Sequence, residues 1–219
     1  MVQIGTASSP RPDSAAAIKK KREILEAASR VFRRKGLHAS GMRDIAAEAG
    51  MRVGNLYYYF EGKTELLAFC QLETLNGLMK LARGVEGRDL PPSCKLHLLV
   101  AGHVVLLNEG TPGSLAHLEV EALEEPWRGE IVARRAEYED VFRKVIAEGI
   151  RAGTFRETDV KTAVLAILGA VNWTVKWFRP DGLNTAGEIG DLFAEQMVRG
   201  LLADPPASGD DEKASDDAE

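Results

Sequence analysis

The stretch that decides the fold is residues 42–60, which read MRDIAAEAGMRVGNLYYYF. In its first half Ile45 and Ala49 stand four residues apart, a spacing that puts both side chains on one face of a helix. Gly50 follows and can take a positive φ without a steric clash, so the chain can turn there. Two short helices joined by such a turn form a helix-turn-helix, the geometry that delivers a recognition helix to the DNA major groove.

The second helix of the motif is expected over residues 52–60, with Val53 and Leu56 on its inward face. Residues 57–59 are three consecutive tyrosines. Neighbouring side chains on a helix point about 100° apart, so the three rings cannot all enter the core. Each ring has two alternative roles, core packing or contact outside the domain, and we expect at least one hydroxyl to face outward.

The residues around the motif resemble the DNA-binding domain of the TetR family of transcriptional repressors. This resemblance rests on a run from Gly36 to Leu67 that contains GLHAS, MRDIA, GNLYYYF and KTELL. The second half of the chain is similar to the family less specifically, through GIRAGTF at 149–155, Trp173 and WFRPDG at 177–182. The resemblance covers residues 15–203 and implies an all-α fold of nine helices.

The resemblance also implies how the chain is divided. We expect a flexible arm at 1–13, a three-helix DNA-binding domain at 14–61, a helical ligand-binding and dimerisation domain at 62–203 and an acidic disordered tail at 204–219. The apolar spacing and the Gly and Pro breaks predict where the nine helices lie. The expected ranges are 14–35, 41–49, 52–60, 63–83, 93–108, 114–124, 126–150, 160–178 and 185–202.

The DNA contacts that the resemblance implies lie in and beside the motif. Arg43 and Arg52 are candidates for base edges or phosphates, because Arg pairs bidentately with guanine O6 and N7. Asn55 either reads adenine in the same way or caps the turn. The other implied DNA-binding residues are Ser40, Val53, Tyr57, Tyr58, Tyr59 and Lys63.

Several of these positions carry a more specific expectation. Ser40 is suited to cap the first helix of the motif, and Lys63 opens the next helix beside free backbone N–H groups, where a phosphate can bind. Tyr57 and Tyr59 match positions that the family aims at the DNA backbone, and Tyr58 stands where the family often has His. Family members usually carry Ser or Thr at Ser40 and Gly41 and a Ser-Lys pair at residues 52–53. This chain has Gly41 and Arg52-Val53 at these positions, and we expect its own operator preference to arise at Arg52-Val53.

The charge of the chain is distributed unevenly. The net charge of the 219 residues is −5, which alone argues against a nucleic-acid binder. Residues 1–60, however, hold eleven Lys and Arg against five Asp and Glu, and the rest hold seventeen against twenty-eight. A basic head on an acidic body suits a protein that presents only one end to phosphates.

Other features exclude several classes of protein. The two cysteines, Cys70 and Cys94, lack the paired spacing of a disulfide framework or metal knuckle and suit a reducing cytoplasm. No apolar run is long enough to span a membrane, so no membrane partner is expected. His117-Leu-Glu119 is too sparse for a metal site, and no spacing assembles a nucleophile, a base or a metal cluster. We therefore expect no catalytic residue, no metal and no cofactor.

An effector pocket is expected among the helices of the body. A regulator of this kind needs two states and a molecule that binds one of them better. An apolar lining with a few polar groups would suit an apolar or amphipathic effector, such as an acyl-CoA or another lipid or aromatic metabolite. The candidate lining residues, each of which could equally be ordinary core, are His103, Leu107, Leu118, Tyr138, Phe142 and Asn172.

A dimer interface is expected on the last two helices. One short recognition helix reads too few base pairs, so two heads related by a two-fold axis are needed to read a palindrome. The apolar faces of 160–178 and 185–202 exceed what one partner helix covers, although simple intramolecular packing is the alternative. The candidate interface residues are Ala166, Ala170, Trp173, Trp177, Ile189, Leu192, Phe193 and Met197.

Taken together, these patterns predict a cytoplasmic transcriptional repressor, not an enzyme. Its expected partners are double-stranded operator DNA, a small-molecule effector and a second copy of the chain. The alternatives are a helical small-molecule-binding protein without DNA activity and, least favoured, a metal-free helical enzyme. The basic head separates the first prediction from both alternatives, since neither needs one.

Overall fold

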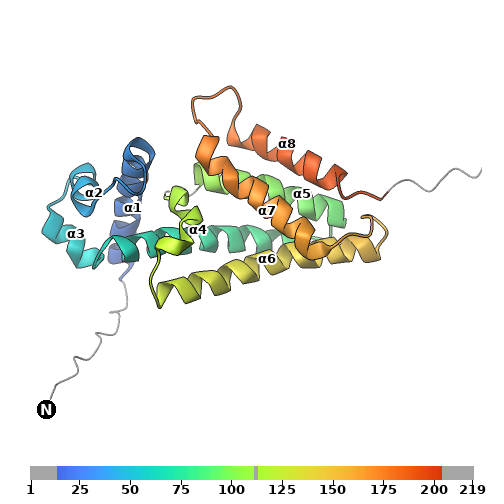
Figure 1. Cartoon of the computed structure of the whole chain (residues 1–219), viewed down its shortest axis with the longest axis horizontal. Coiled ribbons are helices and arrows are strands. Elements are labelled where there is room, and N and C mark those ends of the chain that lie inside the picture. The colour runs from blue at the N-terminus through green and yellow to red at the C-terminus, as the bar shows by residue number, and fades with distance from the viewer. Residues whose placement is uncertain (1–13, 111–112, 204–219) are drawn as a thin grey trace, which may run out of the picture.

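The computed structural model describes residues 14–110 and 113–203, and the described chain is all-helical (Figure 1). The expected arm at 1–13 and tail at 204–219 lie outside the described residues. The all-α prediction is confirmed. The α-helices are α1 (Ala15–Lys35), α2 (Met42–Glu48), α3 (Val53–Tyr59), α4 (Lys63–Glu86), α5 (Pro92–Val105), α6 (Trp127–Arg151), α7 (Val160–Trp177) and α8 (Ala186–Arg199).

The described residues contain eight α-helices instead of the nine expected. The helix expected at 114–124 is absent: a π-helical turn, Leu106–Gly110, extends α5, and two 3-10 segments follow at Ser114–Leu118 and Val120–Ala122. Between the two segments Glu119 has φ −97° and ψ 53°, which is not helical. Its carbonyl accepts a hydrogen bond from Gln71 Nε2 on α4 at 3.2 Å, so a tertiary contact replaces helical continuation.

Helix α1 begins and packs as its sequence predicts. The Ser14 hydroxyl accepts a hydrogen bond from the Ala17 amide at 3.2 Å, which caps the helix N-terminus. Its apolar side chains at helical spacing, among them Ile24, Leu25 and Phe32, are buried. Helices α1, α2 and α3 pack together into a small head at one end of the molecule (Figure 1).

The body is built around α5. Helix α4 runs out of the head and lies alongside α6, while α7 and α8 lie over α5 (Figure 1). Gly190 allows α8 to approach α5 closely, since a Cβ there would stand 2.8 Å from the Ala101 carbonyl oxygen. Helices α7 and α8 therefore each use one face against the body and leave the other face outward.

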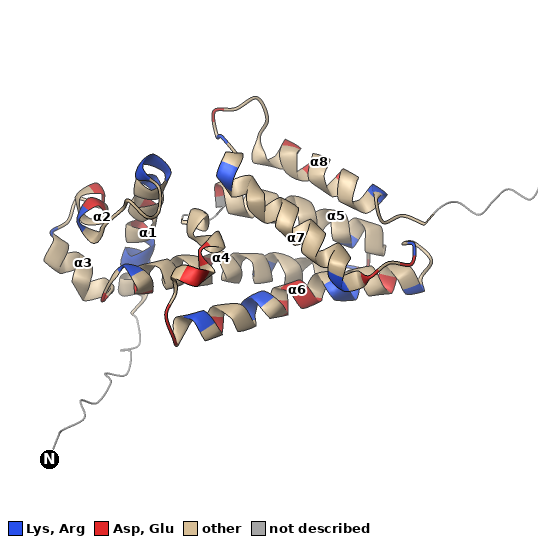
Figure 2. Ribbon diagram, in the orientation of Figure 1, with Lys and Arg blue, Asp and Glu red and all other residues tan. Residues whose placement is uncertain are grey.

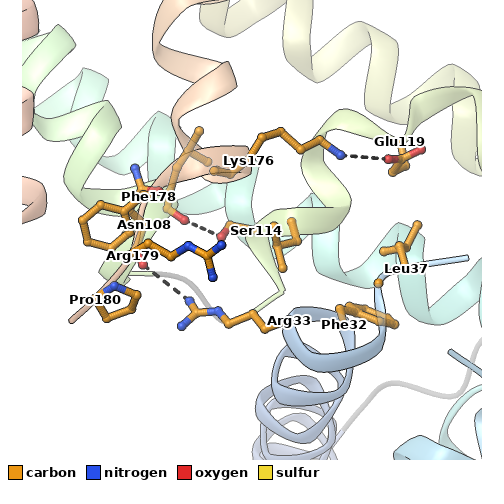
Figure 3. Close-up of a pocket in the computed structure, with 14 residues that line it drawn as sticks. Phe32, Arg33, Leu37, Asn108, Ser114, Glu119, Lys176, Phe178, Arg179 and Pro180 are labelled. Atoms are coloured by element: carbon orange, nitrogen blue, oxygen red, sulfur yellow. Dashed lines mark hydrogen bonds and ion pairs between the residues drawn. The ribbon is translucent and has the colours of Figure 1, made fainter. Parts of the chain in front are cut away.

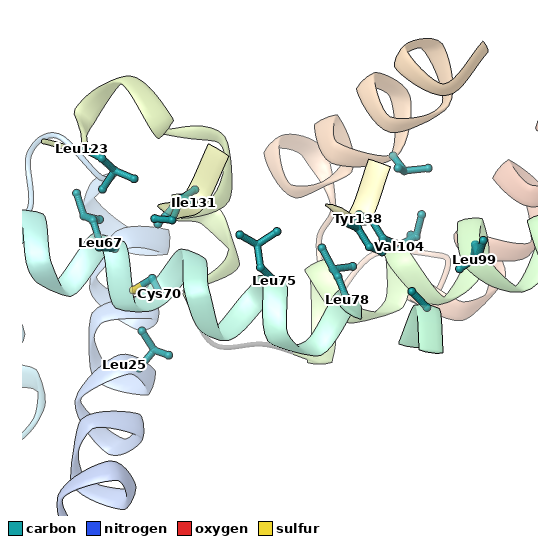
Figure 4. Packing of buried hydrophobic residues seen from close by; sticks show 14 of the residues in the cluster. Leu25, Leu67, Cys70, Leu75, Leu78, Leu99, Val104, Leu123, Ile131 and Tyr138 are labelled. Atoms are coloured by element: carbon teal, nitrogen blue, oxygen red, sulfur yellow. The ribbon is translucent and has the colours of Figure 1, made fainter. Parts of the chain in front are cut away.

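The hydrophobic core is continuous between head and body. Figure 4 follows this cluster from Leu25 of α1 past Cys70 of α4 toward Leu99 of α5. All three side chains are buried. Gly113, which precedes the first 3-10 segment, lies against both Cys70 and Leu25. The connection after α5 is thus packed onto the junction between head and body.

In the described part of the chain, no helix combines the length and apolar character that crossing a membrane requires. The same residues hold no group of three His, Cys, Asp or Glu side chains placed to bind a metal ion.

Candidate functional site

The turn between α2 and α3 fixes the direction of α3. Gly50 has φ +64°, in the left-handed region that only glycine adopts freely. The Met51 amide donates to the Ala46 carbonyl at 2.9 Å and closes the turn. Leu56 of α3 is fully buried, and Ala46 is small enough to let α3 come close. The motif is therefore a helix-turn-helix with α3 carried on the outside of the head.

The outer face of α3 presents polar and aromatic groups together. Arg52, Asn55 and Tyr58 are exposed and line a shallow hollow of about 500 Å³ on the head. Tyr57 is 50% exposed and Tyr58 75% exposed, which are high values for aromatic rings on a small domain. Arg43 on α2 is also exposed. Cationic, amide and phenolic groups on one helix suit contact with phosphates and base edges.

Two residues assigned to DNA contact are half-buried against the core. Val53 is half-buried against the hydrophobic core, because it stands three residues before buried Leu56. Tyr59 is also half-buried on the core, yet it lines the same hollow as Arg52, and its ring meets Tyr58 edge-on with centroids 5.1 Å apart. The side chains of Val53 and Tyr59 therefore position α3, while Tyr57 and Tyr58 are the two rings offered outward.

Ser40 does not cap α2, which corrects the sequence-based expectation. Its side chain is 3% exposed, and its hydroxyl donates to the Gly36 carbonyl at 2.6 Å. The N-cap residue of α2 is Gly41, whose amide donates to Asp44 Oδ2 at 3.0 Å. Lys35 beside Asp44, at 2.6 Å, and the Gly41 amide together hold the pKa of this carboxyl below its usual range. Ser40 thus stabilises the loop and offers no hydroxyl to DNA.

Lys63 makes two hydrogen bonds within the head that the sequence did not predict. Its Nζ donates to the carbonyls of Leu37 at 2.6 Å and Ser40 at 2.7 Å, and so ties α4 to the loop between α1 and α2. Burial lowers the pKa of the Lys63 amine. An ammonium group has three donors, so one remains for a phosphate. Lys63 is therefore a structural residue first, and its phosphate contact stays a prediction.

We expect Lys63→Met to destabilise the protein by about 1 to 2 kcal/mol, because it leaves two partly buried carbonyls without their donor. Chemical denaturation measures this loss. Lys80→Met is the matched control, since Lys80 is exposed on the same helix. Equal stability of the Lys63 and Lys80 variants would show that the two hydrogen bonds contribute nothing.

A residue of α1 that the sequence-based prediction missed also reaches the outer face of α3. Lys20 lines the same hollow as Arg52 and Asn55 while pairing with Glu23 at 2.8 Å. Figure 2 shows Lys and Arg gathered near both ends of α1. The signal was present in the basic run at 19–22, but only the folded head brings that run beside α3.

Three of the expected effector residues meet inside the body. His103 is 1% exposed, and its ring nitrogens stand 3.1 Å from the Tyr138 hydroxyl and 3.1 Å from Asn172 Oδ1. Burial lowers the pKa of His103 to about 4, so the ring is neutral near pH 7. Because Asn172 Oδ1 can only accept, His103 Nε2 carries the proton and Nδ1 accepts from the Tyr138 hydroxyl. These groups form one hydrogen-bonded chain across α5, α6 and α7.

The three apolar residues of the expected effector set do not all contact the hydrogen-bonded group of His103, Tyr138 and Asn172. Phe142 is buried with its ring edge-on to Tyr138, centroids 5.3 Å apart. Leu107 is buried and lines a separate cavity that none of the other five expected residues lines. Leu118 is half-buried at the end of the first 3-10 segment. None of the described cavities is lined by all six residues.

A second buried polar cluster, missed at the sequence level, lies beside His103. The Arg135 guanidinium donates to the His117 carbonyl, and both burial and nearby Arg135 lower the pKa of His117. Within the described residues, Gln71 Oε1, His117 Nδ1 and Arg135 Nε are buried without a hydrogen-bond partner. Buried polar atoms are rarely left this way, so each one calls for a polar partner. The members come from α4, the first 3-10 segment and α6, which explains why no sequence motif revealed them.

The outward faces of α7 and α8 expose large apolar side chains. Trp173 is 59% exposed and Leu192 is 52% exposed, while Trp177 stacks on Phe193 with centroids 6.2 Å apart. Leu165, missed in the sequence, is 52% exposed on the same stripe of α7, eight residues before Trp173. Of the other expected residues, Ala166 is exposed, and the half-buried ones are Ala170, Ile189 and Met197.

Two protein-family models match this chain. The chain matches the model described as "Bacterial regulatory proteins, tetR family" over residues 24–69. It also matches the model described as "Tetracyclin repressor-like, C-terminal domain" over residues 89–201. The first match covers the helix-turn-helix head, and the second covers the body.

Three relatives are similar along most of their length. The HTH-type transcriptional repressor KstR2 of Mycobacterium tuberculosis is 27% identical over 182 residues, which are 82% of this chain and 91% of KstR2. The crystal structure of PfmR, a TetR family transcriptional regulator from Thermus thermophilus, is 31% identical with a TM-score of 0.75, covering 82% of this chain and 99% of PfmR. AibR, solved in complex with isovaleryl coenzyme A and operator DNA, is 26% identical with a TM-score of 0.71, covering 84% of this chain and 98% of AibR.

These relatives are transcriptional regulators, not enzymes, and the two matches follow the division between head and body. The helix-turn-helix and the helical body are thus accounted for by one family, and the chain belongs to the TetR family of DNA-binding transcriptional regulators.

Proposed function

We propose that this protein is a cytoplasmic repressor that binds a palindromic operator as a homodimer and leaves it when a small amphipathic molecule binds the body. The observation that carries the proposal is the outer face of α3, where Arg52, Asn55, Tyr57 and Tyr58 are exposed together on a TetR-family head. A protein that needed only to hold a small molecule would have no need of such a face.

The roles on the duplex follow from the chemistry of each side chain. Arg52 stands at the start of α3 and Asn55 one turn later, so both can reach base edges in the major groove. Tyr57, Tyr58, Arg43 and the basic run of α1 suit the phosphates on either side. Specific sequence choice then rests on Arg52 and Asn55, and overall affinity rests on the others.

Dimerisation is proposed for the outward faces of α7 and α8. These faces expose Leu165, Trp173 and Leu192 in one region, together with the partly exposed ring of Trp177. A two-fold pairing of the same patch would cover the apolar side chains of both copies. It would also set the spacing of the two heads at about one helical turn of DNA, 34 to 36 Å.

The effector is proposed to bind the body near the two buried polar clusters. Gln71, His117 and Arg135 hold unpartnered polar atoms, and the chain of His103, Tyr138 and Asn172 lies beside them. An effector with an apolar part and a polar group that both donates and accepts hydrogen bonds would satisfy these atoms. The complex of the similar regulator AibR with isovaleryl coenzyme A supports acyl-CoA esters as the first class to test.

The proposal is tested by fluorescence anisotropy with DNA from the protein's own promoter region. Affinity should fall steeply as salt rises, because phosphate contacts release counterions. Arg52→Ala and Asn55→Ala should each reduce discrimination against a mutated operator by about 1 to 3 kcal/mol. Arg151→Ala, which removes an exposed arginine at the far end of α6, is the matched control. Unchanged discrimination in both α3 variants would remove the case for α3 as the reading helix.

A further inference from the structure

The strongest feature that the proposed function leaves unexplained is a cavity at the junction of head and body. It has a volume of about 360 Å³, within the range of small-molecule sites. One wall is the end of α1 and the residues after it, and the others are the connection after α5 and the end of α7 (Figure 3). A molecule bound there would touch the DNA-binding head and the body at once.

The cavity is strongly cationic for its size. Arg33, Lys176 and Arg179 line it, and Glu119 is the single carboxylate in the lining. Lys176 pairs with Glu119 at 3.4 Å, so that carboxylate is already neutralised from within the cavity. The two arginines remain as the uncompensated charges.

Neither arginine is occupied by a carboxylate. Within the residues that the structure describes, the one hydrogen bond of Arg33 is a long one, 3.5 Å, from Nη2 to the Asn108 carbonyl. Arg179 makes no ion pair with any described carboxylate. Both guanidinium groups face the same space in Figure 3. One of these arginines belongs to the head and the other to the segment that follows α7.

Apart from Asn108 and Ser114, the rest of the lining is apolar. Its side chains include Phe32, Leu107, Leu115, Val175 and Phe178. A free inorganic anion would leave this surface unused, whereas a molecule with an anionic end and an apolar part would use both kinds of wall. The cavity therefore favours an amphipathic anion.

The number of converging donors favours phosphate over carboxylate. A single guanidinium is enough to bind both oxygens of a carboxylate, so a carboxylate ligand would leave the second arginine without a partner. A phosphate carries about −1.5 to −2 charge and three acceptor oxygens, which suits two arginines from opposite walls. We propose that this cavity binds the phosphate-bearing end of an amphipathic effector through Arg33 and Arg179, and so ties the head to the body.

The inference rests on the proposed function, because one effector molecule would occupy both places. Its apolar part would bind the body, and its anionic end would bind the junction cavity. The first 3-10 segment and the residue after it connect the two places. Leu115 and Glu119 line the junction cavity, while His117 of the same segment belongs to the buried cluster beside His103. A phosphate bridging Arg33 and Arg179 would couple occupancy of the body to the position of α1.

Isothermal titration calorimetry on the full chain tests the site without DNA. The probes are palmitoyl-coenzyme A and isovaleryl-coenzyme A, with free coenzyme A and palmitate as the two halves. Each of Arg33→Gln and Arg179→Gln should raise the Kd of the thioester that binds the wild type by about tenfold. The Kd of palmitate should change less than twofold. Arg151→Gln is the matched control and should change neither value.

Several results would overturn the inference. The inference fails if neither thioester binds the wild type, or if the Kd of the thioester in both cavity variants stays within twofold of the wild-type Kd. It also fails if Arg151→Gln raises that Kd by the same factor, or if the Kd of palmitate rises as much as that of the thioester when either cavity arginine is replaced. The operator affinity of Arg33→Gln without ligand is measured as well, and a fall there would assign Arg33 to DNA. Thermal unfolding confirms that the variants fold.

The proposed function fails separately from the site. If palmitoyl-coenzyme A binds through both arginines and the operator complex survives, the phosphate site stands and the effector role does not. If a thioester releases DNA equally from the wild type and from both variants, the effector role stands and this site does not.

Discussion

Trp173→Glu is expected to turn the proposed dimer into monomers and to weaken operator binding by roughly 100-fold or more. Trp173 is 59% exposed in the middle of the α7 stripe, so its replacement leaves the fold of one chain intact. In a two-fold pairing each copy would bury this carboxylate against the apolar side chains of the patch, which costs desolvation of the charge. Analytical ultracentrifugation measures the oligomeric state, and fluorescence anisotropy measures the operator affinity.

The control for this variant is Val132→Glu. Val132 is 50% exposed on α6, outside the patch formed by α7 and α8, so the same charge there should change neither quantity. A Trp173→Glu protein that stays dimeric would show that the second copy binds elsewhere. A monomer that retains full operator affinity would show that one head suffices.

Acidification is expected to destabilise the protein as the pH falls below about 6.5, chiefly through its two buried histidines. Burial lowers the pKa of His103 to about 4, and it lowers that of His117 as well. Between pH 6.5 and 4 the unfolded chain therefore binds more protons than the folded one, so stability falls with pH. For His103 alone the loss amounts to about 3 kcal/mol by pH 4.

Chemical denaturation at a series of pH values between 7.5 and 4 measures this dependence. His103→Gln should flatten the slope below pH 6.5, even though it also lowers stability at pH 7.5 by disrupting the contacts with Tyr138 and Asn172. His38→Gln, at an exposed position, is the matched control. An unchanged slope for His103→Gln would mean that this ring is charged in the folded protein or open to water.

The helix-turn-helix could be predicted from sequence because its determinants are local. Ile45, Gly50 and Leu56 specify one helix face, one turn and one anchor, and the structure has Gly50 at φ +64° and Leu56 fully buried. The apolar stripes of α7 and α8 were equally visible, since helical spacing alone defines them. Local periodicity, capping and turn chemistry thus determined the all-α class and the candidate reading helix.

Tertiary contacts decided what the local pattern could not. Ser40 and Lys63 both matched DNA-contact positions, yet one donates to Gly36 and the other to two carbonyls of the loop before α2. The helix expected at 114–124 gave way to 3-10 segments because Gln71, far away in sequence, takes the Glu119 carbonyl.

The same limit applies to the interior and to the junction cavity. Arg135 and His117, or Arg33 and Arg179, are unremarkable where they stand in the chain, and only packing brings each pair together. By itself, the sequence determined the eight α-helices of the described residues, their inward faces and the motif that reads DNA, because these depend on neighbours within a few residues. The tertiary structure alone decided which polar groups are buried, paired or left open to a ligand, because those properties depend on distant segments that meet only in the folded molecule.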